Sequence, residues 1–284
     1  MNTKVSIVYL TKNGGPLFRE SLKAVFTQKP TFNFEVVAID SGSTDGTLAL
    51  LKEYPVRVFH ILPYEFNFGI TRDYGFSVCR GEIVIALSTD VIPVGTDWLS
   101  DIVAPFDDPN IAAVQGIDVL PPSDNLFYWE KVGLFYFTRE CRAWIERHDG
   151  IGMSFTSCAI RRQVWEENRM GAVEMAEDKV FQKKLWEKGY KIYFQRKARD
   201  YHTHVYDVIS LAKRCRNEGL GWRNVEQIYT FHDMVADMCN LRVLRVLYDG
   251  VINFKITRIA EMLFPFIRPL YIFIGNHFTK KYIR

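Results

Sequence analysis

The sequence has few cysteines, and their spacing forms no recognisable framework. There are five in 284 residues, an odd number, and no two form a CxxC pair. This spacing argues against a disulfide framework and against a cysteine-based zinc site. We therefore expect the protein to function in a reducing compartment. The net charge is only +3, which is too small to indicate that the protein binds nucleic acid.

Long apolar runs are also missing. No segment reaches the roughly 18 consecutive apolar residues that a membrane-spanning helix needs, and the N-terminus enters VSIVYL without the long apolar region of a signal peptide. We therefore expect a cytoplasmic protein without a spanning segment. Hydrophobic residues still make up 48% of the chain, enough to bury a full core.

Segments of strand length alternate with helical patterns in the first half of the chain. The expected strands are residues 5–10, 34–39, 56–61 and 83–87. Between them, residues 17–26 and 47–54 show the apolar spacing of helices. This alternation predicts an α/β fold with a mostly parallel sheet flanked by helices.

The second half of the sequence is less regular. Residues 120–156 are rich in aromatic side chains, and we expect helix and loop there. A strand at 154–160, a helix at 177–188 and a strand at 190–194 are expected to follow, and helical patterns dominate from residue 206. We therefore expect an α/β domain over residues 1–205 and a C-terminal helical appendage over residues 206–284.

Polar residues follow three of the expected strands. Thr11 follows the first strand, Asp40 the second, and Asp90 lies three residues beyond the strand at 83–87. Ligands of such sheets gather outside the carboxyl ends of the strands, so we expect these residues to line one crevice.

Asp40 begins the polar part of the stretch AIDSGSTDGT, which lacks both GxxxxGK[ST] and GxGxxG. A carboxylate at this position suits ribose hydroxyls or the N–H group of a pyrimidine base. For Asp45 a helix-start role is equally compatible with the sequence, with Ser43 as the capping residue.

Asp90 ends the triplet STD and could bind a divalent metal, because magnesium and manganese take oxygen ligands and often use one or two protein carboxylates beside a diphosphate. His202 and His204 would share one face if the chain is extended there, and imidazole is a further ligand for such metals. The alternative is that both histidines lie on a partly exposed turn.

Glu177 and Asp178 open the expected helix at 177–188. Adjacent acids are common in a first helical turn, but one of them could also act as a general base. Arg72 is expected among turn residues, where it could bridge to a diphosphate, hold Asp40 or Asp90 in place, or form a surface ion pair.

In this order, the motifs resemble the family 2 glycosyltransferases, which have the Rossmann-like GT-A fold. The resemblance spans residues 4–205 and is carried by VSIVYLTKNG, VVAIDSGSTDGT, FGITRDYGFSVCRGEIVIALSTD, SCAIRRQVW and MAEDKVFQKKLWEKGYKIYF. Within the family, EFNFGITRDYG, STDVIP and WLSDIVAPFDDPNIAAVQG are most similar to the rhamnosyltransferase-like branch that acts on bacterial surface polysaccharides.

The resemblance implies an inverting transfer of rhamnose or another hexose. The donor would be a dTDP-, UDP- or GDP-linked sugar, and the acceptor a hydroxyl of a growing surface glycan or of a polyprenyl-linked glycan. Manganese or magnesium would assist. Two other readings remain open: a nucleotidyltransferase, disfavoured by the lack of a glycine-rich basic loop near the N-terminus, and a non-catalytic nucleotide-sugar-binding scaffold subunit.

The resemblance also assigns roles to individual residues. Asp178 matches the catalytic base, and Asp90 matches the metal-binding last aspartate of the DxD motif, with His202 or His204 as a further metal ligand. Ser88 replaces the first aspartate of that motif. The residues that the resemblance places at the substrate are Thr11, Asp40, Arg72, Asp73, Trp165 and Glu177.

The segment 263–278 is aromatic and aliphatic, and basic residues follow it at 280, 281 and 284. This pattern is typical of a helix that lies in a membrane interface, which predicts peripheral association with the inner face of the cytoplasmic membrane. Alternatively, the segment packs on the protein's own core or on a second subunit of a homo-oligomer.

Overall fold

The computed structural model describes residues 3–283, which divide into two compact units. The sheet unit consists of the chain up to Val119, Met153–Val173 and Glu177–His202. The helical unit consists of Leu120–Gly152, Glu174–Ala176 and the chain from Thr203 onward. Only the last part of the helical unit begins near the predicted boundary at residue 206. Its other two parts, which include the aromatic-rich middle of the chain, lie inside the predicted domain of residues 1–205.

The sheet unit is built on an eight-stranded mixed sheet with the order β3-β2-β1-β4-β7-β6-β8-β5. Neighbours β1, β2, β3 and β4 pair in parallel, as do β6 and β8, whereas β7 is antiparallel to β4 and β6. The strands are β1 Val5–Thr11, β2 Phe34–Asp40, β3 Val56–His60, β4 Ile83–Leu87, β5 Ile92–Pro93, β6 Ile111–Val119, β7 Ser157–Arg161 and β8 Lys191–Tyr201.

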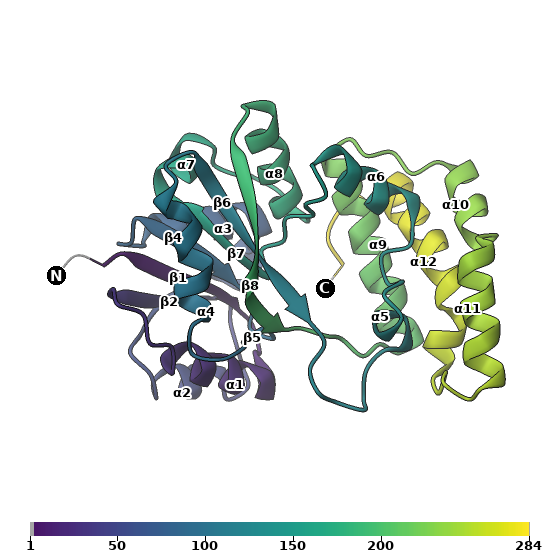
Figure 1. The fold of residues 1–284 in the computed structure, drawn as a ribbon, viewed down its shortest axis with the longest axis horizontal. Helices are drawn as coiled ribbons and strands as arrows, with labels where there is room; N and C mark the ends of the chain where they lie inside the picture. Colours follow the sequence, from purple (N-terminus) through teal and green to yellow (C-terminus); the bar gives the residue numbers. More distant parts are fainter. Residues whose placement is uncertain (1–2, 284) are drawn as a thin grey trace. The chain divides into compact units, whose positions relative to one another are not determined.

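Helices cover both faces of this sheet (Figure 1). Alternate strand residues point to opposite faces, so Ile7 packs with α1, α2 and α4, whereas Val8 packs with α3, α7 and α8. The helical segments of the sheet unit are α1 Gly15–Phe26, α2 Thr47–Leu51, α3 Phe68–Ser77, α4 Trp98–Val103, α7 Arg162–Glu167, α8 Glu177–Glu187 and the short 3₁₀ turns Pro63–Glu65 and Ala104–Asp107. The predicted α/β fold is confirmed.

One predicted element of the sheet unit is wrong, because Arg72 lies inside helix α3 and not among turn residues. Two glycines in this segment lower its helix propensity, which argues for a turn when the sequence is read alone. In the structure both are needed for close packing: a Cβ on Gly69 would lie 2.1 Å from the carbonyl oxygen of Gly171, and one on Gly75 would lie 2.9 Å from the Val8 side chain.

The helical unit contains six helices among the residues that the structure describes. They are α5 Tyr128–Lys131, α6 Arg139–Arg147, α9 Val208–Asn224, α10 Phe231–Met238, α11 Leu241–Ile252 and α12 Ile259–Phe278. The unit is held together by α9 and α12, which approach so closely that glycines are required at the contact. A Cβ on Gly219 would lie 2.1 Å from the carbonyl oxygen of Ile272, and one on Gly275 would lie 2.0 Å from that of Arg216.

Helix α12 does not lie free on a surface as an interfacial helix would. It runs through Pro265 and Pro269 without a break, and its side chains Phe264 and Ile272 are fully buried. Arg268 is also buried and donates two hydrogen bonds to the Glu218 carboxylate, at 2.6 and 3.1 Å. The segment is therefore a core helix of its unit, as the alternative prediction had it.

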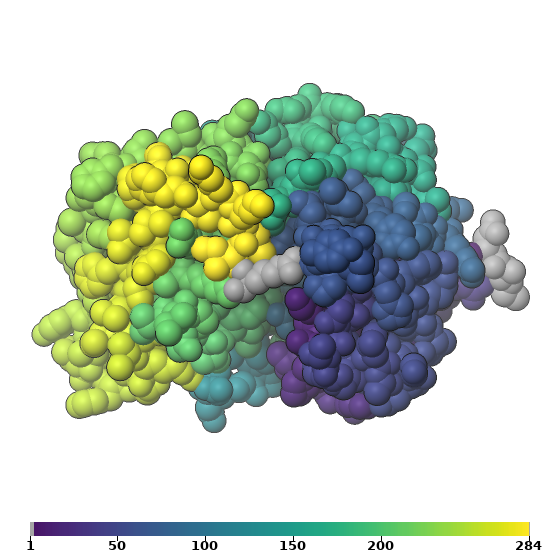
Figure 2. Space-filling view, turned by 180° about the vertical axis from the view of Figure 1, so that it is seen from behind, coloured from purple at the N-terminus to yellow at the C-terminus, as the bar shows by residue number. Residues whose placement is uncertain are grey.

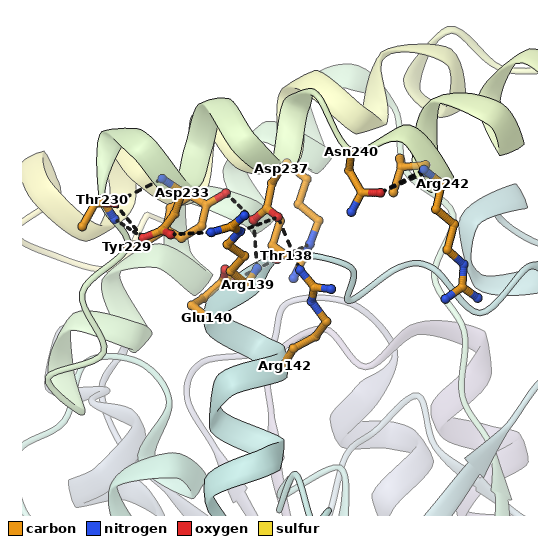
Figure 3. Close-up of polar contacts among 12 residues, drawn as sticks. Thr138, Arg139, Glu140, Arg142, Tyr229, Thr230, Asp233, Asp237, Asn240 and Arg242 are labelled. Carbon is orange, nitrogen blue, oxygen red and sulfur yellow. Dashed lines mark hydrogen bonds and ion pairs between the residues drawn. The ribbon is translucent and has the colours of Figure 1, made fainter.

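A buried carboxylate joins α10 to the start of α6. Asp237 accepts hydrogen bonds from the Tyr229 hydroxyl at 2.9 Å and from the Arg139 backbone N–H at 2.8 Å (Figure 3). The guanidinium groups of Arg139 and Arg142 lie 3.8 and 3.7 Å from its other oxygen. Burial raises the pKa of Asp237, and these donors oppose the shift. A negative charge at this position also suits the positive end of the α6 dipole.

Within residues 3–283, no helix has the length and apolar character needed to cross a membrane. Side chains of α11 and α12 nevertheless reach the surface of the helical unit, visible as the yellow-green and yellow atoms of Figure 2.

The glycine contact between α9 and α12 can be tested by Gly219→Ala. The added methyl group has no room beside the Ile272 carbonyl, so we expect the free energy of unfolding to fall by about 3 kcal/mol. Gly152→Ala is the control, because its Cβ would meet the nearest atom at an ordinary 3.4 Å. Urea unfolding followed by tryptophan fluorescence measures both; equal midpoints for the two variants would contradict the close contact.

Candidate functional site

Acidic and polar side chains gather at one edge of the sheet. Strands β1, β2, β4 and β6 run in the same direction, so their carboxyl ends share this edge. Thr11 ends β1 and Asp40 ends β2 as its register partner, while Asp118 lies near the end of β6. The pairing of β1 with β2 therefore brings Thr11 and Asp40 next to each other.

Asp40 is a buried carboxylate that shapes the loop after β2. Its Oδ1 accepts a hydrogen bond from the Thr11 hydroxyl at 3.2 Å, and its Oδ2 accepts from the backbone N–H groups of Gly42 and Ser43 at 3.0 and 3.1 Å. Burial acts to raise the pKa of Asp40, but these hydrogen bonds outweigh it and lower the pKa. Asp40 is thus held ionised at the carboxyl end of the sheet.

Asp45 has the helix-start role, but Ser43 is not the capping residue. Asp45 accepts a hydrogen bond from the backbone N–H of Thr47, the first residue of α2, at 2.9 Å. The hydroxyl of Ser43 instead accepts from the backbone N–H of Asn13, at 2.9 Å. The predicted cap was wrong because α2 begins at Thr47, as expected, and Gly46 occupies the N-cap position, three residues after Ser43.

A buried ion pair joins α3 to the start of α8. The Arg72 guanidinium lies 3.2 Å from Oε1 of Glu177, and the two residues are only 5% and 6% exposed. The guanidinium also stacks over the Phe155 ring, at 5.3 Å from its centroid. Burial raises the pKa of Glu177, and Arg72 opposes that shift. Two further nitrogens of Arg72, Nε and Nη1, have no hydrogen-bond partner among the described residues.

Asp178 is the partly exposed member of the adjacent acids. Its side chain is 18% exposed. Oδ1 accepts a hydrogen bond from the Lys179 backbone N–H at 2.7 Å, and Oδ2 lies 3.6 Å from the Lys179 ammonium. That ammonium is itself anchored to the Met153 carbonyl. Asp178 is therefore oriented at the N-terminus of α8 and still reaches solvent.

Asp73 and Trp165 bind each other in the interior of the sheet unit. Oδ1 of Asp73 accepts hydrogen bonds from the Trp165 indole at 2.7 Å and from the Met170 backbone N–H at 3.1 Å, and Oδ2 accepts from Gly171 at 2.8 Å. Trp165 is almost fully buried. This arrangement gives both residues a structural role and offers no support for the predicted contact with substrate.

Asp90 and His202 form the candidate metal site of the sheet unit. Nε2 of His202 lies 3.9 Å from Oδ2 of Asp90, and Nδ1 lies 3.0 Å from Oδ2 of Asp118. Although burial disfavours the charged imidazole, the three nearby carboxylates of Asp118, Asp90 and Asp200 raise the pKa of His202. One carboxylate and one imidazole facing each other suit a manganese-like or magnesium-like ion.

The two histidines do not share a strand face, because β8 ends at Tyr201. His202 closes the sheet unit, and His204 is the second residue of the helical unit.

Two acidic residues near this site were missed by sequence reasoning. Asp118 lies on β6 and pairs in register with Asp200 on β8. Burial, and then the charge of Asp118, raises the pKa of Asp200 to about 8. The apolar run IAAV that begins at residue 111 could have indicated β6. Asp118 and Asp200 themselves carry no motif.

Comparison with known proteins shows which family the chain is similar to. Residues 6–169 match the family model described as glycosyl transferase family 2. The chain is 30% identical over 213 residues to the O-antigen chain rhamnosyltransferase RfbN of Salmonella typhimurium, a match that covers 72% of this chain and 67% of that one.

Two solved structures share the fold. One is a mannosyltransferase from Pyrobaculum calidifontis in complex with GDP-Man and Mn²⁺, with 16% identity, a TM-score of 0.64, and coverage of 99% of this chain and 89% of that one. The other is glucosyl-3-phosphoglycerate synthase from Mycobacterium tuberculosis in complex with Mn²⁺, UDP-glucose and phosphoglyceric acid, with 15% identity, a TM-score of 0.58, and coverage of 78% and 79%.

The fold is therefore that of the GT-A glycosyltransferases. The family model covers more than half of the chain, so the protein belongs to glycosyl transferase family 2 and is a glycosyltransferase. The resemblance predicted from the ordered motifs is confirmed.

The ion pair between Arg72 and Glu177 predicts a specific pattern of stability. Arg72→Met leaves the Glu177 carboxylate buried and uncompensated, which costs about 3–5 kcal/mol of unfolding free energy. The double variant Arg72→Met with Glu177→Gln removes both charges, so we expect it to regain part of that loss. Urea unfolding of the two single variants and the double variant measures the coupling; strictly additive losses would show that the charges do not interact.

Proposed function

We propose that the protein is an inverting glycosyltransferase that moves rhamnose or another hexose from a nucleoside-diphosphate sugar to a hydroxyl of a growing surface glycan or lipid-linked acceptor. The observation that carries the mechanism is the difference between two adjacent acids. Glu177 is buried and paired with Arg72, whereas Asp178 is oriented by Lys179 and still reaches solvent. Of the two acids, the solvent-accessible Asp178 is the one to which we assign the action on an entering hydroxyl.

The nucleotide is assigned to the carboxyl ends of β1 and β2. Thr11 and Asp40 lie there as register partners joined by a hydrogen bond. The loop after β2 is fixed by Asp40, and polar loop groups at such an edge suit the base or ribose of a nucleotide. Thymidine, uridine and guanosine donors all remain candidates. The relative RfbN, a rhamnosyltransferase, favours a rhamnose donor.

A divalent ion, manganese or magnesium, is assigned to Asp90 and His202. His204 follows after a single residue, so it is a third candidate ligand. When bound, the ion would neutralise charge that develops on the departing diphosphate. Ser88, at the first position of the DxD motif, offers only a neutral hydroxyl, so the carboxylate of Asp90 carries the negative charge of this motif.

Asp178 acts as the general base in this mechanism. A carboxylate oxygen of Asp178 accepts the proton of the acceptor hydroxyl while the hydroxyl oxygen attacks the anomeric carbon. The bond between that carbon and the diphosphate breaks on the opposite side. A single displacement of this kind inverts the anomeric configuration. Asp178 lies in the first turn of α8, with the Lys179 ammonium 3.6 Å from its Oδ2. Arg72 contributes by holding Glu177, and therefore the first turn of α8, in place.

The catalytic assignment is tested by Asp178→Asn, which keeps the shape of the side chain but cannot take a proton. We expect transfer and donor hydrolysis to fall by about 10²–10⁴-fold, with donor affinity close to that of the wild type. The control is Asp107→Asn, which changes an exposed acid of the sheet unit. A panel of dTDP-rhamnose, UDP-glucose and GDP-mannose with manganese provides the substrates.

Three outcomes of this panel are decisive. Loss of turnover in Asp178→Asn alone supports the base, and equal turnover in both variants excludes it. A wild-type protein that binds a nucleotide sugar but turns none of them over would favour the non-catalytic scaffold.

We also propose that the protein works in the cytoplasm at the inner face of the membrane, where a lipid-linked acceptor would be presented. The surface that supports this is not the buried face of α12 but α11 and the connection to α12. Phe254 is 88% exposed and Tyr248 68% exposed. Arg242 and Arg245 on α11 are exposed and have no ion-pair partner among the described residues. Exposed aromatic and basic side chains together suit an anionic lipid surface.

The membrane proposal is tested by Phe254→Asp. The backbone φ at this residue is +54°, a conformation that aspartate adopts more readily than phenylalanine, so the variant should fold. We expect binding to phosphatidylglycerol vesicles to weaken at least about tenfold, since burial of a phenylalanine contributes about 1.5–3 kcal/mol. Tyr64→Ser, which changes an exposed aromatic of the sheet unit, is the control. Unchanged co-sedimentation of Phe254→Asp would exclude this surface.

A further inference from the structure

We propose that Asp118 is a positioning residue that fixes the imidazole of His202 so that its Nε2 atom faces Asp90. The inference rests on the proposed role of Asp90 and His202 in holding a divalent ion, and nothing in the sequence motifs assigns a role to Asp118.

The imidazole has two nitrogens, and only one can be presented to Asp90. Nδ1 of His202 lies 3.0 Å from Oδ2 of Asp118, within hydrogen-bond distance, whereas Nε2 lies 3.9 Å from Oδ2 of Asp90. A carboxylate that accepts from Nδ1–H selects the tautomer whose lone pair is on Nε2. The lone pair then points toward the carboxylate with which it would share a metal ion.

A backbone hydrogen bond also joins His202 to strand β6, next to Asp118. The His202 N–H donates to the Val119 carbonyl at 3.3 Å, which continues the β6–β8 ladder by one residue beyond Tyr201. His202 is therefore tied to β6 through its main chain and through its ring. The ring is mostly buried, with 14% of the side chain exposed. Both ties limit the rotation of the imidazole.

The carboxylate of Asp118 lies beside a buried acid, while 40% of the Asp118 side chain is exposed. Asp200 is its register partner on β8 and is fully buried. Gly116 lies two residues before Asp118 on β6, and a Cβ there would lie 2.8 Å from Oγ of Ser157 and 3.4 Å from Oδ2 of Asp200. The absence of a side chain at Gly116 therefore leaves room for Ser157 and Asp200 next to the strand that carries Asp118.

The first test measures the tautomer of His202 in the metal-free protein by ¹⁵N NMR, at a pH where the ring is neutral. We expect the wild type to carry the proton on Nδ1. Asp118→Ala should lose this preference, and Asp118→Asn, whose amide oxygen still accepts a hydrogen bond, should keep most of it. An unchanged tautomer in Asp118→Ala would overturn the inference whatever the protein does with metal.

The second test measures Mn²⁺ affinity by electron paramagnetic resonance in the presence of dTDP. We expect Asp118→Ala to bind about 10–100-fold more weakly than the wild type, with Asp118→Asn in between and the exposed-site control Asp107→Ala unchanged. Equal affinity in Asp118→Ala and the wild type would overturn the positioning role.

Asp90→Ala separates the two proposals. If this variant binds Mn²⁺ as tightly as the wild type, the proposed metal site is wrong, while the tautomer result still reports on Asp118.

Discussion

The buried ion pair between Arg72 and Glu177 is the interaction on which the rest of the site depends. A buried ion pair is stable only if both partners are present and well placed. The pair between Arg72 and Glu177 therefore fixes the start of α8 against α3. Asp178 follows Glu177 directly in the first turn of α8, so its backbone is held in place by the same ion pair. The two neighbouring acids therefore differ: Glu177 is buried against a charged partner, whereas the Asp178 side chain is 18% exposed and reaches solvent.

Much of the fold could be predicted because the strands of the first half are short, apolar and separated by helical spacing. The same apolar pattern predicts where β1, β2 and β4 end. It therefore also predicts the positions of Thr11, Asp40 and Asp90 along the chain. Helix α3 was hidden by Gly69 and Gly75, whose value lies in contacts with residues distant in the sequence. Asp118 and Asp200 were hidden for a similar reason: neither has a local signal, and only the pairing of β6 with β8 brings them together.

The C-terminal segment shows a second limit of sequence reasoning. Apolar and aromatic residues of one helix are compatible with a lipid surface and with a protein core, and composition does not distinguish them. What decides is a buried partner. Arg268 on α12 finds Glu218 on α9, and Gly219 and Gly275 allow the two backbones to touch. Residues left outside this contact, on α11 and its connection to α12, become the exposed apolar surface instead.

The chain passes between the two units at residues 119/120, 152/153, 173/174, 176/177 and 202/203. Strand β6 precedes the first segment of the helical unit, its neighbour β7 follows that segment, and its other neighbour β8 follows the second segment, Glu174–Ala176. During synthesis, the ribosome must therefore deliver Leu120–Gly152 of the helical unit before the sheet can be completed, whereas the long segment from Thr203 follows the last strand. A nascent chain halted at residue 150 would hold β6 without its neighbours β7 and β8, and an unpaired strand edge of this kind is prone to aggregation.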